Sequence, residues 1–393
     1  MSAHHKFVFP LLLSLFWGAH LVAWLCTLVL ARARRWRTRI LLLALFLVLP
    51  FGFPAAWIWS MRSPGLLPRL LHAVLSLWLA ILVNFVIALA ATLMVWCPIA
   101  LYRRRFKIRG PVLLAALVAG TATLYGIVNA RFPRIHRVEV RIRNLPPQWE
   151  GRTIVQLSDV HLGLVQGPGF LDRVVRQVNA LEPDLIAITG DLFDGLMPRS
   201  DIFVPGLSRL SGRHGVFFVT GNHEGYAGTE KVLGLLAGAK NIRVLDNEVV
   251  TIDGLQLAGA SYPVYNRRPR HPPITARALR RDLPAILLFH TPTGLDTAYA
   301  DRRTQQMATY FLPAPDFRAA REMGIDLQLS GHTHAGQTFP FGSLTRRLFK
   351  GYDRGLHTMG DFSLYVSAGT GTWGPPMRIG CNPEITLLTL RAK

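Results

Sequence analysis

The chain has 393 residues, of which 50% are hydrophobic and only 17% are charged, and its formal net charge is +21. This composition excludes a disordered chain and is more apolar than that of ordinary soluble proteins. Residues 1–130 contain 13 Lys and Arg but no Asp or Glu, whereas residues 131–393 contain 31 basic and 23 acidic residues. This uneven distribution argues against a nucleic-acid-binding protein and predicts a membrane anchor joined to a globular domain.

Four uncharged apolar stretches lie in the first third, at residues 7–30, 40–60, 70–96 and 111–130. Each has at least the ~20 residues that a helix needs to cross ~30 Å of hydrocarbon. We expect all four to be retained, because a cleavable signal peptide has a single apolar core of about 7–15 residues. Pro50 and Pro54 leave two possibilities for the second stretch, a kinked span or a re-entrant hairpin. His20, His72 and Asn84 are expected to form hydrogen bonds between helices rather than an ion path.

After a basic connector with the first edge strand at residues 131–150, short β-branched runs alternate with helical segments from 151 to 393. Phe170–Leu181, for example, places apolar residues on one face of a helix. Strands interleaved with helices indicate an α/β layered domain. The expected strands are Thr153–Ser158, Leu185–Thr189, Val216–Thr220, Ile242–Leu245, Leu255–Ala258, Ala285–Phe289, Asp326–Ser330, Leu364–Ser367 and Glu384–Leu390.

Polar residues follow the ends of five of these strands. Because open α/β sheets bind ligands at the carboxyl ends of their strands, we expect these residues to come together. Imidazole, carboxylate and carboxamide groups without a thiolate suit Mn²⁺, Fe²⁺ or Zn²⁺. The segments, in chain order, are Ser158-Asp159-Val160-His161, Gly190-Asp191, Gly221-Asn222-His223-Glu224, His290 and Gly331-His332-Thr333-His334.

Each segment alone is a weak signal, since a Gly-Asn pair before a helix is more often a turn and cap. Together and in this order they resemble the calcineurin-like metallophosphoesterase superfamily over about residues 150–390. The C-terminal sequence Gly369-Thr370-Gly371-Thr372-Trp373-Gly374-Pro375-Pro376-Met377-Arg378 resembles the bacterial membrane-linked phosphodiesterase branch of that superfamily. That branch includes small phosphodiesterases and some UDP-2,3-diacylglucosamine hydrolases. The resemblance implies an α/β layered fold, a β-sandwich flanked by helices, after the four transmembrane helices.

The resemblance also implies a centre of two divalent metal ions. Two cations about 3.5–4 Å apart need a shared anionic ligand, and together they make hydroxide available near neutral pH for in-line attack on a phosphoester. By this resemblance Asp159, His161 and His334 would bind the first ion, Asn222, His290 and His332 the second, and Asp191 would bridge both.

Residues beside these ligands receive other roles. His223 is expected to act as general acid for the leaving oxygen or to stabilise transition-state charge. Glu224 stands where many relatives have Asp, and we expect it to support the ligands rather than to bind metal. Asp194 would orient a ligand or cap the next turn. Arg378 would contact a substrate phosphate or form a structural salt bridge.

The leading interpretation is a membrane-anchored binuclear phosphoesterase with a phosphoester or phosphodiester substrate, including a lipid-linked one. Its partners would be membrane lipids and that substrate, and no nucleic acid. One alternative is a UDP-diacylglucosamine-type pyrophosphate hydrolase on the cytoplasmic face. A second is a transport or regulatory membrane protein with a phosphate-sensing domain, although the spans lack Asp, Glu, Lys and Arg. A third, a binding module with a dead site, would be expected to lack Asp191, Asn222 or His223.

The charge of the loops predicts an orientation. The loops after the first and third spans, within residues 32–39 and 103–109, contain ten basic residues, whereas the short segments of the opposite side contain only Lys6, Arg62 and Arg69. The five arginines of residues 131–143 are set aside because they are expected to belong to the folded domain, and large domains cross the membrane largely regardless of charge. The positive-inside rule places the ten in the cytoplasm, so that after four crossings the catalytic domain lies outside. The expectation is a multi-pass protein of a bacterial inner membrane with an extracytoplasmic domain. If the second stretch were re-entrant, the number of crossings would be odd and this argument for the orientation would no longer hold.

Overall fold

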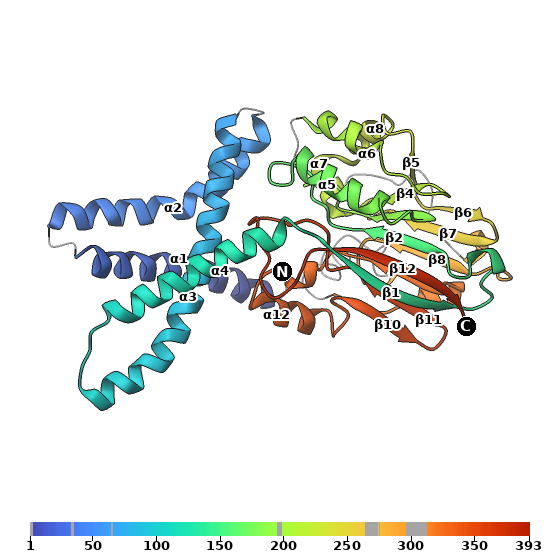
Figure 1. The fold of residues 1–393 in the computed structure, drawn as a ribbon. Coiled ribbons are helices and arrows are strands. Elements are labelled where there is room, and N and C mark those ends of the chain that lie inside the picture. The colour runs from blue at the N-terminus through green and yellow to red at the C-terminus, as the bar shows by residue number, and fades with distance from the viewer. Residues whose placement is uncertain are drawn as a thin grey trace. The chain divides into compact units, whose positions relative to one another are not determined.

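The computed structural model describes residues 3–32, 35–63, 66–194, 199–263, 274, 276–295 and 313–393. The chain forms two compact units (Figure 1). The first comprises Met1–Val128 with Gly374–Met377, and the second comprises Asn129–Trp373 with Arg378–Lys393.

The first unit is helical. Its helices are α1 (Ala3–Ala31), α2 (Trp36–Arg62), α3 (Leu66–Arg103) and α4 (Arg109–Ala130). Among the described residues, the stretches long and apolar enough to cross a membrane are Ser14–Ala31, Trp36–Ser60, Leu70–Arg103 and Arg109–Ala130. Helix α2 continues through Pro50 and Pro54, so the second apolar stretch is one span-length helix and not a hairpin.

Polar side chains inside this unit join helices to one another. Asn84 Nδ2 of α3 donates a hydrogen bond to Thr123 Oγ1 of α4 at 2.8 Å, and Trp78 Nε1 of α3 donates to His20 Nε2 of α1 at 3.3 Å. Interhelical bonds of this kind stabilise helix packing where no water is present. His72 stacks on the ring of Phe53 in α2.

The second unit contains two six-stranded sheets. The order of the first sheet is β1-β12-β2-β3-β4-β5, and β2 to β5 are parallel. The order of the second is β10-β11-β9-β8-β7-β6, in which β7, β8, β9 and β11 are parallel. The strands are β1 (Arg134–Ile142), β2 (Thr153–Leu157), β3 (Leu185–Thr189), β4 (Val216–Val219), β5 (Ile242–Val244), β6 (Glu248–Ile252), β7 (Leu255–Ala260), β8 (Ala285–Phe289), β9 (Leu327–Ser330), β10 (Gly355–Met359), β11 (Phe362–Val366) and β12 (Glu384–Ala392).

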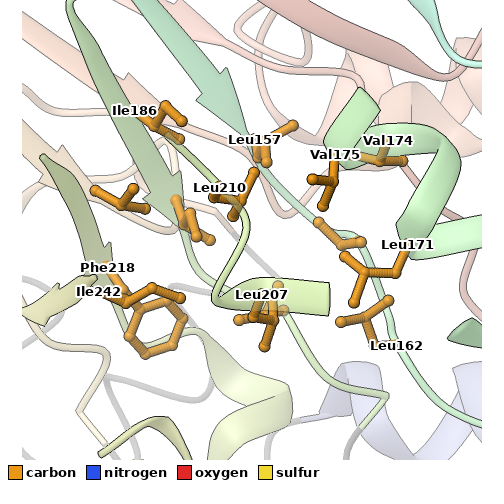
Figure 2. Packing of buried hydrophobic residues seen from close by; sticks show 14 of the residues in the cluster. Leu157, Leu162, Leu171, Val174, Val175, Ile186, Leu207, Leu210, Phe218 and Ile242 are labelled. Atoms are coloured by element: carbon orange, nitrogen blue, oxygen red, sulfur yellow. The ribbon is translucent and has the colours of Figure 1, made fainter. Parts of the chain in front are cut away.

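Successive side chains along a strand point to opposite faces of its sheet, so that one set packs between the two sheets and the other packs against the helices. In β3, Leu185 and Ala187 pack into the core shared by the two sheets, whereas Ile186 and Ile188 face the helices. Both faces of β3 are therefore buried, which explains its uninterrupted apolar sequence. Helix α5 (Pro168–Asn179) contributes Leu171, Val174 and Val175 to an apolar cluster that also contains Leu157 and Ile186; Figure 2 shows Leu157 beside Val175.

Additional helices cover the outer faces. Residues of α6 (Val204–Leu207) and α8 (Thr229–Leu236) join α5 over the first sheet. A separate apolar cluster on the second sheet includes Ala320 of α11 (Arg318–Met323). The expected α/β layered fold, a β-sandwich flanked by helices, is confirmed.

Two strands were not expected from the sequence. Strands β6 and β10 form opposite edges of the second sheet, and both are partly exposed. An edge strand needs fewer apolar residues than a buried central strand, so its sequence pattern is weaker. Both pair antiparallel with the strand that follows them in the chain, so the omission leaves the parallel strands that position the site unchanged.

Candidate metal centre

The polar residues predicted at strand ends come together where the parallel strands of both sheets end. Asp159 and His161 follow β2, Asp191 follows β3, and Asn222 begins α7 (Asn222–Ala227) after β4. From the second sheet, His290 follows β8, and the loop after β9 supplies His332 and His334. Six of these seven side chains belong to buried residues, and His332 is partly buried. Strand direction thus brings together residues up to 175 positions apart in sequence.

One group of possible metal ligands consists of Asp159, His161 and His334. The Nε2 atoms of His161 and His334 lie 3.0 Å apart, and His334 Nε2 lies 3.3 Å from Asp159 Oδ1. Two imidazole nitrogens and a carboxylate oxygen therefore converge on a small volume. Without a cation, this arrangement brings lone pairs against one another unless a proton lies between them.

A second group consists of Asp191, His290 and His332, with Asn222 between the two rings. Asn222 Oδ1 lies 3.0 Å from His290 Nε2 and 2.9 Å from His332 Nδ1. Asp191 Oδ2 lies 3.1 Å from His290 Nε2 and 3.9 Å from His161 Nε2. Asp191 is therefore the carboxylate that contacts residues of both groups.

Several of these residues have a strained backbone. Asp159, His161, Asp191, His332 and His334 all have φ between +49° and +72°. Residues other than glycine rarely adopt this left-handed region, and such strain is concentrated at functional sites. The surrounding packing holds the five donors in place against this cost.

Glycines in the motifs allow the carboxylates to pack closely. A Cβ on Gly221 would collide with Asp191 Oδ1, and a Cβ on Gly331 would collide with Ser158 Oγ and Asp159 Oδ2. Glycine is therefore needed at positions 221 and 331, because residues of another loop occupy the space that a side chain at either position would fill.

Hydrogen bonds fix the orientation of the rings. His290 Nδ1 lies 2.8 Å from the carbonyl oxygen of Thr189, to which it donates, so that Nε2 is left to face Asp191. His161 Nδ1 lies 3.4 Å from Asp194 Oδ1. This contact fits the orienting role expected for Asp194.

Glu224 connects loops and is not one of the converging donors. Its carboxylate accepts hydrogen bonds from the backbone N–H groups of Asp191, Phe193 and Gly221, at 2.9, 3.1 and 2.7 Å. Burial, followed by the charge of Asp191, raises the pKa of Glu224 to about 7. Its position fits the supporting role expected for it.

The charges of the site are coupled. Burial opposes ionisation of Asp191, but neighbouring His290 holds the pKa of Asp191 well below its usual range. Burial would likewise lower the pKa of His290, but Asp191 outweighs it and raises the pKa to about 9. Asp191 is therefore an anion at neutral pH, as a ligand shared by two cations must be.

His223 lies beside the two groups. Its ring centroid lies 4.6 Å from that of His161, and the rings of Tyr226 and Trp373 lie 5.0 and 6.2 Å away. Burial is the main cause that lowers the pKa of His223 to about 4, so the ring is neutral at pH 7. Both aromatic side chains are exposed; no role beside His223 could be assigned to either from the sequence, because Tyr226 of α7 and Trp373 lie far apart in the chain.

Arg378 lies inside the protein. Its guanidinium is fully buried and donates to the carbonyl oxygen of Gly371 from Nε at 2.9 Å and from Nη2 at 2.7 Å. Nη2 also lies 3.3 Å from His334 Nδ1. These contacts replace the substrate phosphate contact and the salt bridge considered from the sequence. Arg378 instead connects a loop to a candidate ligand.

The donor set fits two divalent cations. It supplies four imidazole rings, two carboxylates and one amide in two adjoining groups, with no thiolate among them. These are ligands for borderline or hard divalent ions. Each of the two groups could therefore hold a divalent cation.

Comparison with known proteins agrees with this site. Residues 152–336 match the family model described as calcineurin-like phosphoesterase. The chain is 33% identical to an uncharacterized metallophosphoesterase of Campylobacter jejuni, over 71% of this chain and 70% of that protein. It is 36% identical to a bovine transmembrane protein with metallophosphoesterase domain, over 71% of this chain and 62% of that protein.

A Bacillus subtilis metallophosphoesterase, also uncharacterized, is 30% identical over 74% of this chain and 98% of its own length. The chain spans about two thirds of the length of the first two relatives, and nearly all of the third. The motifs, the fold and these relatives agree: the chain is a membrane protein of the calcineurin-like phosphoesterase family, a metal-dependent phosphoester hydrolase.

Proposed function

We propose that this protein is a membrane-anchored phosphoesterase with two metal ions. Asp159, His161 and His334 would hold one ion, Asn222, His290 and His332 the other, and Asp191 would bridge them. The observation that carries this proposal is the position of Asp191 Oδ2, 3.1 Å from a nitrogen of one group and 3.9 Å from a nitrogen of the other.

Two bound divalent ions would supply a nucleophile from water near neutral pH and neutralise the phosphoryl oxygens. The chain's own residues position the reaction. Asp191 Oδ1 accepts a hydrogen bond from the backbone N–H of His223 at 2.8 Å, which fixes the start of α7 relative to the bridging carboxylate. The His223 ring can then donate a hydrogen bond to a phosphoryl or leaving oxygen.

The proposed substrate is a lipid-linked or membrane-surface phosphoester. Only residues 131–133 separate the end of α4 from the start of β1, which limits the separation of Ala130 and Arg134 to at most ~14 Å. The catalytic unit is therefore tethered to a candidate span. Arg143 pairs with Asp326 and Asp361, so the exposed basic strip near the tether consists of Arg131, Arg134, Arg137 and Arg141.

A direct test compares one phosphodiester in soluble and bilayer-presented forms. The full chain in lipid nanodiscs would be assayed with Mn²⁺, Fe²⁺ or Zn²⁺ and after chelation, with bound metal counted by mass spectrometry. We expect two ions per chain, activity that chelation removes, and faster hydrolysis of the bilayer form. Full activity in excess chelator would contradict the metal centre, and equal rates on both forms would contradict the substrate class.

The proposed orientation places the catalytic unit outside the cytoplasm of a bacterial inner membrane. The continuous helix α2 supports four membrane crossings. The ten basic residues within 32–39 and 103–109 favour a cytoplasmic position for these two loops. A C-terminal alkaline phosphatase fusion should be active, and a C-terminal fluorescent-protein fusion should be dark. The reverse result would place the site in the cytoplasm and favour the nucleotide-linked lipid substrate.

A further inference from the structure

Helix α12 (Phe341–Leu348) has an apolar face that the described part of the protein leaves exposed. None of its eight residues is buried. Phe341, Leu344 and Leu348 are 44%, 52% and 37% exposed, and Phe339 before the helix is 57% exposed. Since a helix turns by ~100° per residue, the three helical side chains lie within an arc of about 60°. They form one continuous stripe.

The rest of the helix is basic. Ser343 and Arg346 lie on the opposite face, and Arg347 borders the apolar stripe. No Asp or Glu occurs from residue 331 to residue 352, whereas Arg346, Arg347 and Lys350 do. An apolar face with arginines behind and beside it is typical of helices that lie in the interface of an anionic membrane.

Helix α12 is firmly attached to the candidate metal centre. At its start, a Cβ on Gly336 would come within 2.5 Å of Gly342, so the loop after His334 and the first turn of the helix pack backbone against backbone. At its end, buried Phe349 packs against the ring of His332, with centroids 6.2 Å apart. Whatever surface binds α12 therefore lies next to the loop that supplies two of the proposed ligands.

The same loop is linked to the end of a candidate span. Asn129, in the last turn of α4, donates hydrogen bonds from Nδ2 to the carbonyl oxygens of Arg378 and Cys381, at 3.2 and 3.1 Å. The guanidinium of Arg378 in turn contacts His334. Two steps of contact therefore join the membrane end of α4 to a proposed metal ligand.

We propose that α12 inserts its apolar stripe into the headgroup region of an anionic bilayer and holds the entrance of the metal centre at the membrane surface. The occupant of the stripe is lipid, because the chain is a membrane protein, the helix is basic, and its loop is linked to the end of a span. Resting on the proposed function, this assigns substrates whose phosphoester lies at headgroup depth.

The test uses single cysteines in the full chain, reconstituted in nanodiscs of phosphatidylcholine with or without phosphatidylglycerol. Cys26, Cys97 and Cys381 would first be replaced, in a background that retains the metal content of the parent. Leu344→Cys places an environment-sensitive NBD fluorophore on the stripe. Ser343→Cys places the same fluorophore on the opposite face of the same helix and is the matched control.

At position 344 we expect blue-shifted emission, and quenching by nitroxide lipids roughly threefold stronger than at position 343. Aqueous iodide should show the opposite preference. Arg346→Gln and Arg347→Gln should each weaken docking by up to about fivefold, and only in nanodiscs containing phosphatidylglycerol.

Equal iodide quenching at positions 343 and 344 would show that the apolar stripe is exposed to solvent. Shielding of position 344 from both quenchers would show a protein occupant, either the chain's own helices or a second copy. Either result overturns the proposal.

Activity provides a separate result. Leu344→Ser should slow hydrolysis of the bilayer-presented ester about tenfold and leave hydrolysis of the soluble ester unchanged, whereas Ser343→Ala should affect neither. If the fluorophores report insertion but Leu344→Ser affects both esters equally, docking stands and the membrane-substrate part of the proposed function fails. If the fluorophores report insertion and Leu344→Ser leaves hydrolysis of both esters unchanged, docking likewise stands and the membrane-substrate part of the proposed function likewise fails.

Discussion

The buried guanidinium of Arg378 lies 3.3 Å from Nδ1 of His334, on the side of the ring opposite the atom that faces Asp159. Arg378 also holds the carbonyl oxygen of Gly371, whose N–H donates to the carbonyl oxygen of Asp159 at 2.9 Å. Arg378 therefore supports two of the three proposed ligands of the first ion: it contacts His334 directly and Asp159 through the backbone of Gly371.

Arg378→Met should weaken binding of that ion by roughly 10–100-fold, the usual effect of removing a group that orients a ligand. Metal counting should give about one ion per chain at limiting metal, and excess metal should restore activity. Arg391→Met, at an exposed arginine that pairs with Glu139 and Glu150, is the control and should keep both ions. If Arg378→Met bound metal as tightly as the parent, Arg378 would stabilise the fold without orienting the metal ligands.

Asp191→Asn should be the most damaging change at the centre. The amide keeps the shape but lacks the charge that two adjacent cations need between them. Turnover should fall by about 10³-fold or more, with loss of bound metal. Asp194→Asn is the matched comparison, because Asp194 Oδ1 lies 3.4 Å from the outer nitrogen of His161 and 3.9 Å from His223 Nδ1, and Asp194 is expected to orient a ligand rather than to bridge the ions. It should weaken metal binding by about 10–100-fold and remain rescuable by added metal. Equal losses in the two variants would argue against a bridging Asp191.

His223→Ala should separate catalysis from metal binding. The ring lies beside the proposed ligands and is expected to serve the leaving or phosphoryl oxygen, so turnover should fall by roughly 10²–10⁴-fold while both ions remain. His290→Ala should instead lose metal, since its Nε2 contacts both Asp191 and Asn222. Metal analysis and turnover would be measured on the same preparations. If His223→Ala lost as much metal as His290→Ala, His223 would be a ligand.

The stability of the metal-free protein should depend on His223 in mild acid. Burial lowers the pKa of His223 from 6.5 to about 4 in the folded protein, so between these pH values the unfolded chain binds a proton that the folded protein does not. Stability from this residue is therefore present above pH 6.5 and is lost as pH falls toward 4, by up to roughly 3 kcal/mol.

His223→Asn cannot take up this proton. Without metal, its melting temperature relative to that of the parent should therefore rise progressively as pH falls from 6.5 to 4. Thermal melts of both proteins in the same detergent would measure the difference. A difference independent of pH would show that the imidazole is protonated equally in the folded and unfolded states.

Much of this protein follows from local sequence. The four candidate spans could be predicted because a helix that crosses a membrane must be apolar over about 20 residues, and all four stretches meet this requirement. Strands such as Leu185–Thr189 could be predicted because both faces are buried, which requires a continuous apolar run. The edge strands β6 and β10 lacked such a run and were missed.

The candidate ligands were predictable for a related reason. Each of these residues stands within four positions of the end of a strand, and parallel strands bring their carboxyl ends to one edge. They are Asp159, Asp191, Asn222, His290, His332 and His334. Strand direction therefore determines which residues meet, without any knowledge of side-chain packing.

Tertiary structure decided the roles that depend on distant contacts. In the sequence, a phosphate and a carboxylate are equally good partners for Arg378, but the fold buries its guanidinium against Gly371 and His334. Likewise, the residues of α12 form an ordinary amphipathic pattern, and only the structure shows that no described element covers the apolar side. Local sequence determines membrane spans, buried strands and the chemistry at their ends, because these depend on neighbours along the chain. Which side chain supports another, and which face stays open, depends on packing between segments far apart in sequence.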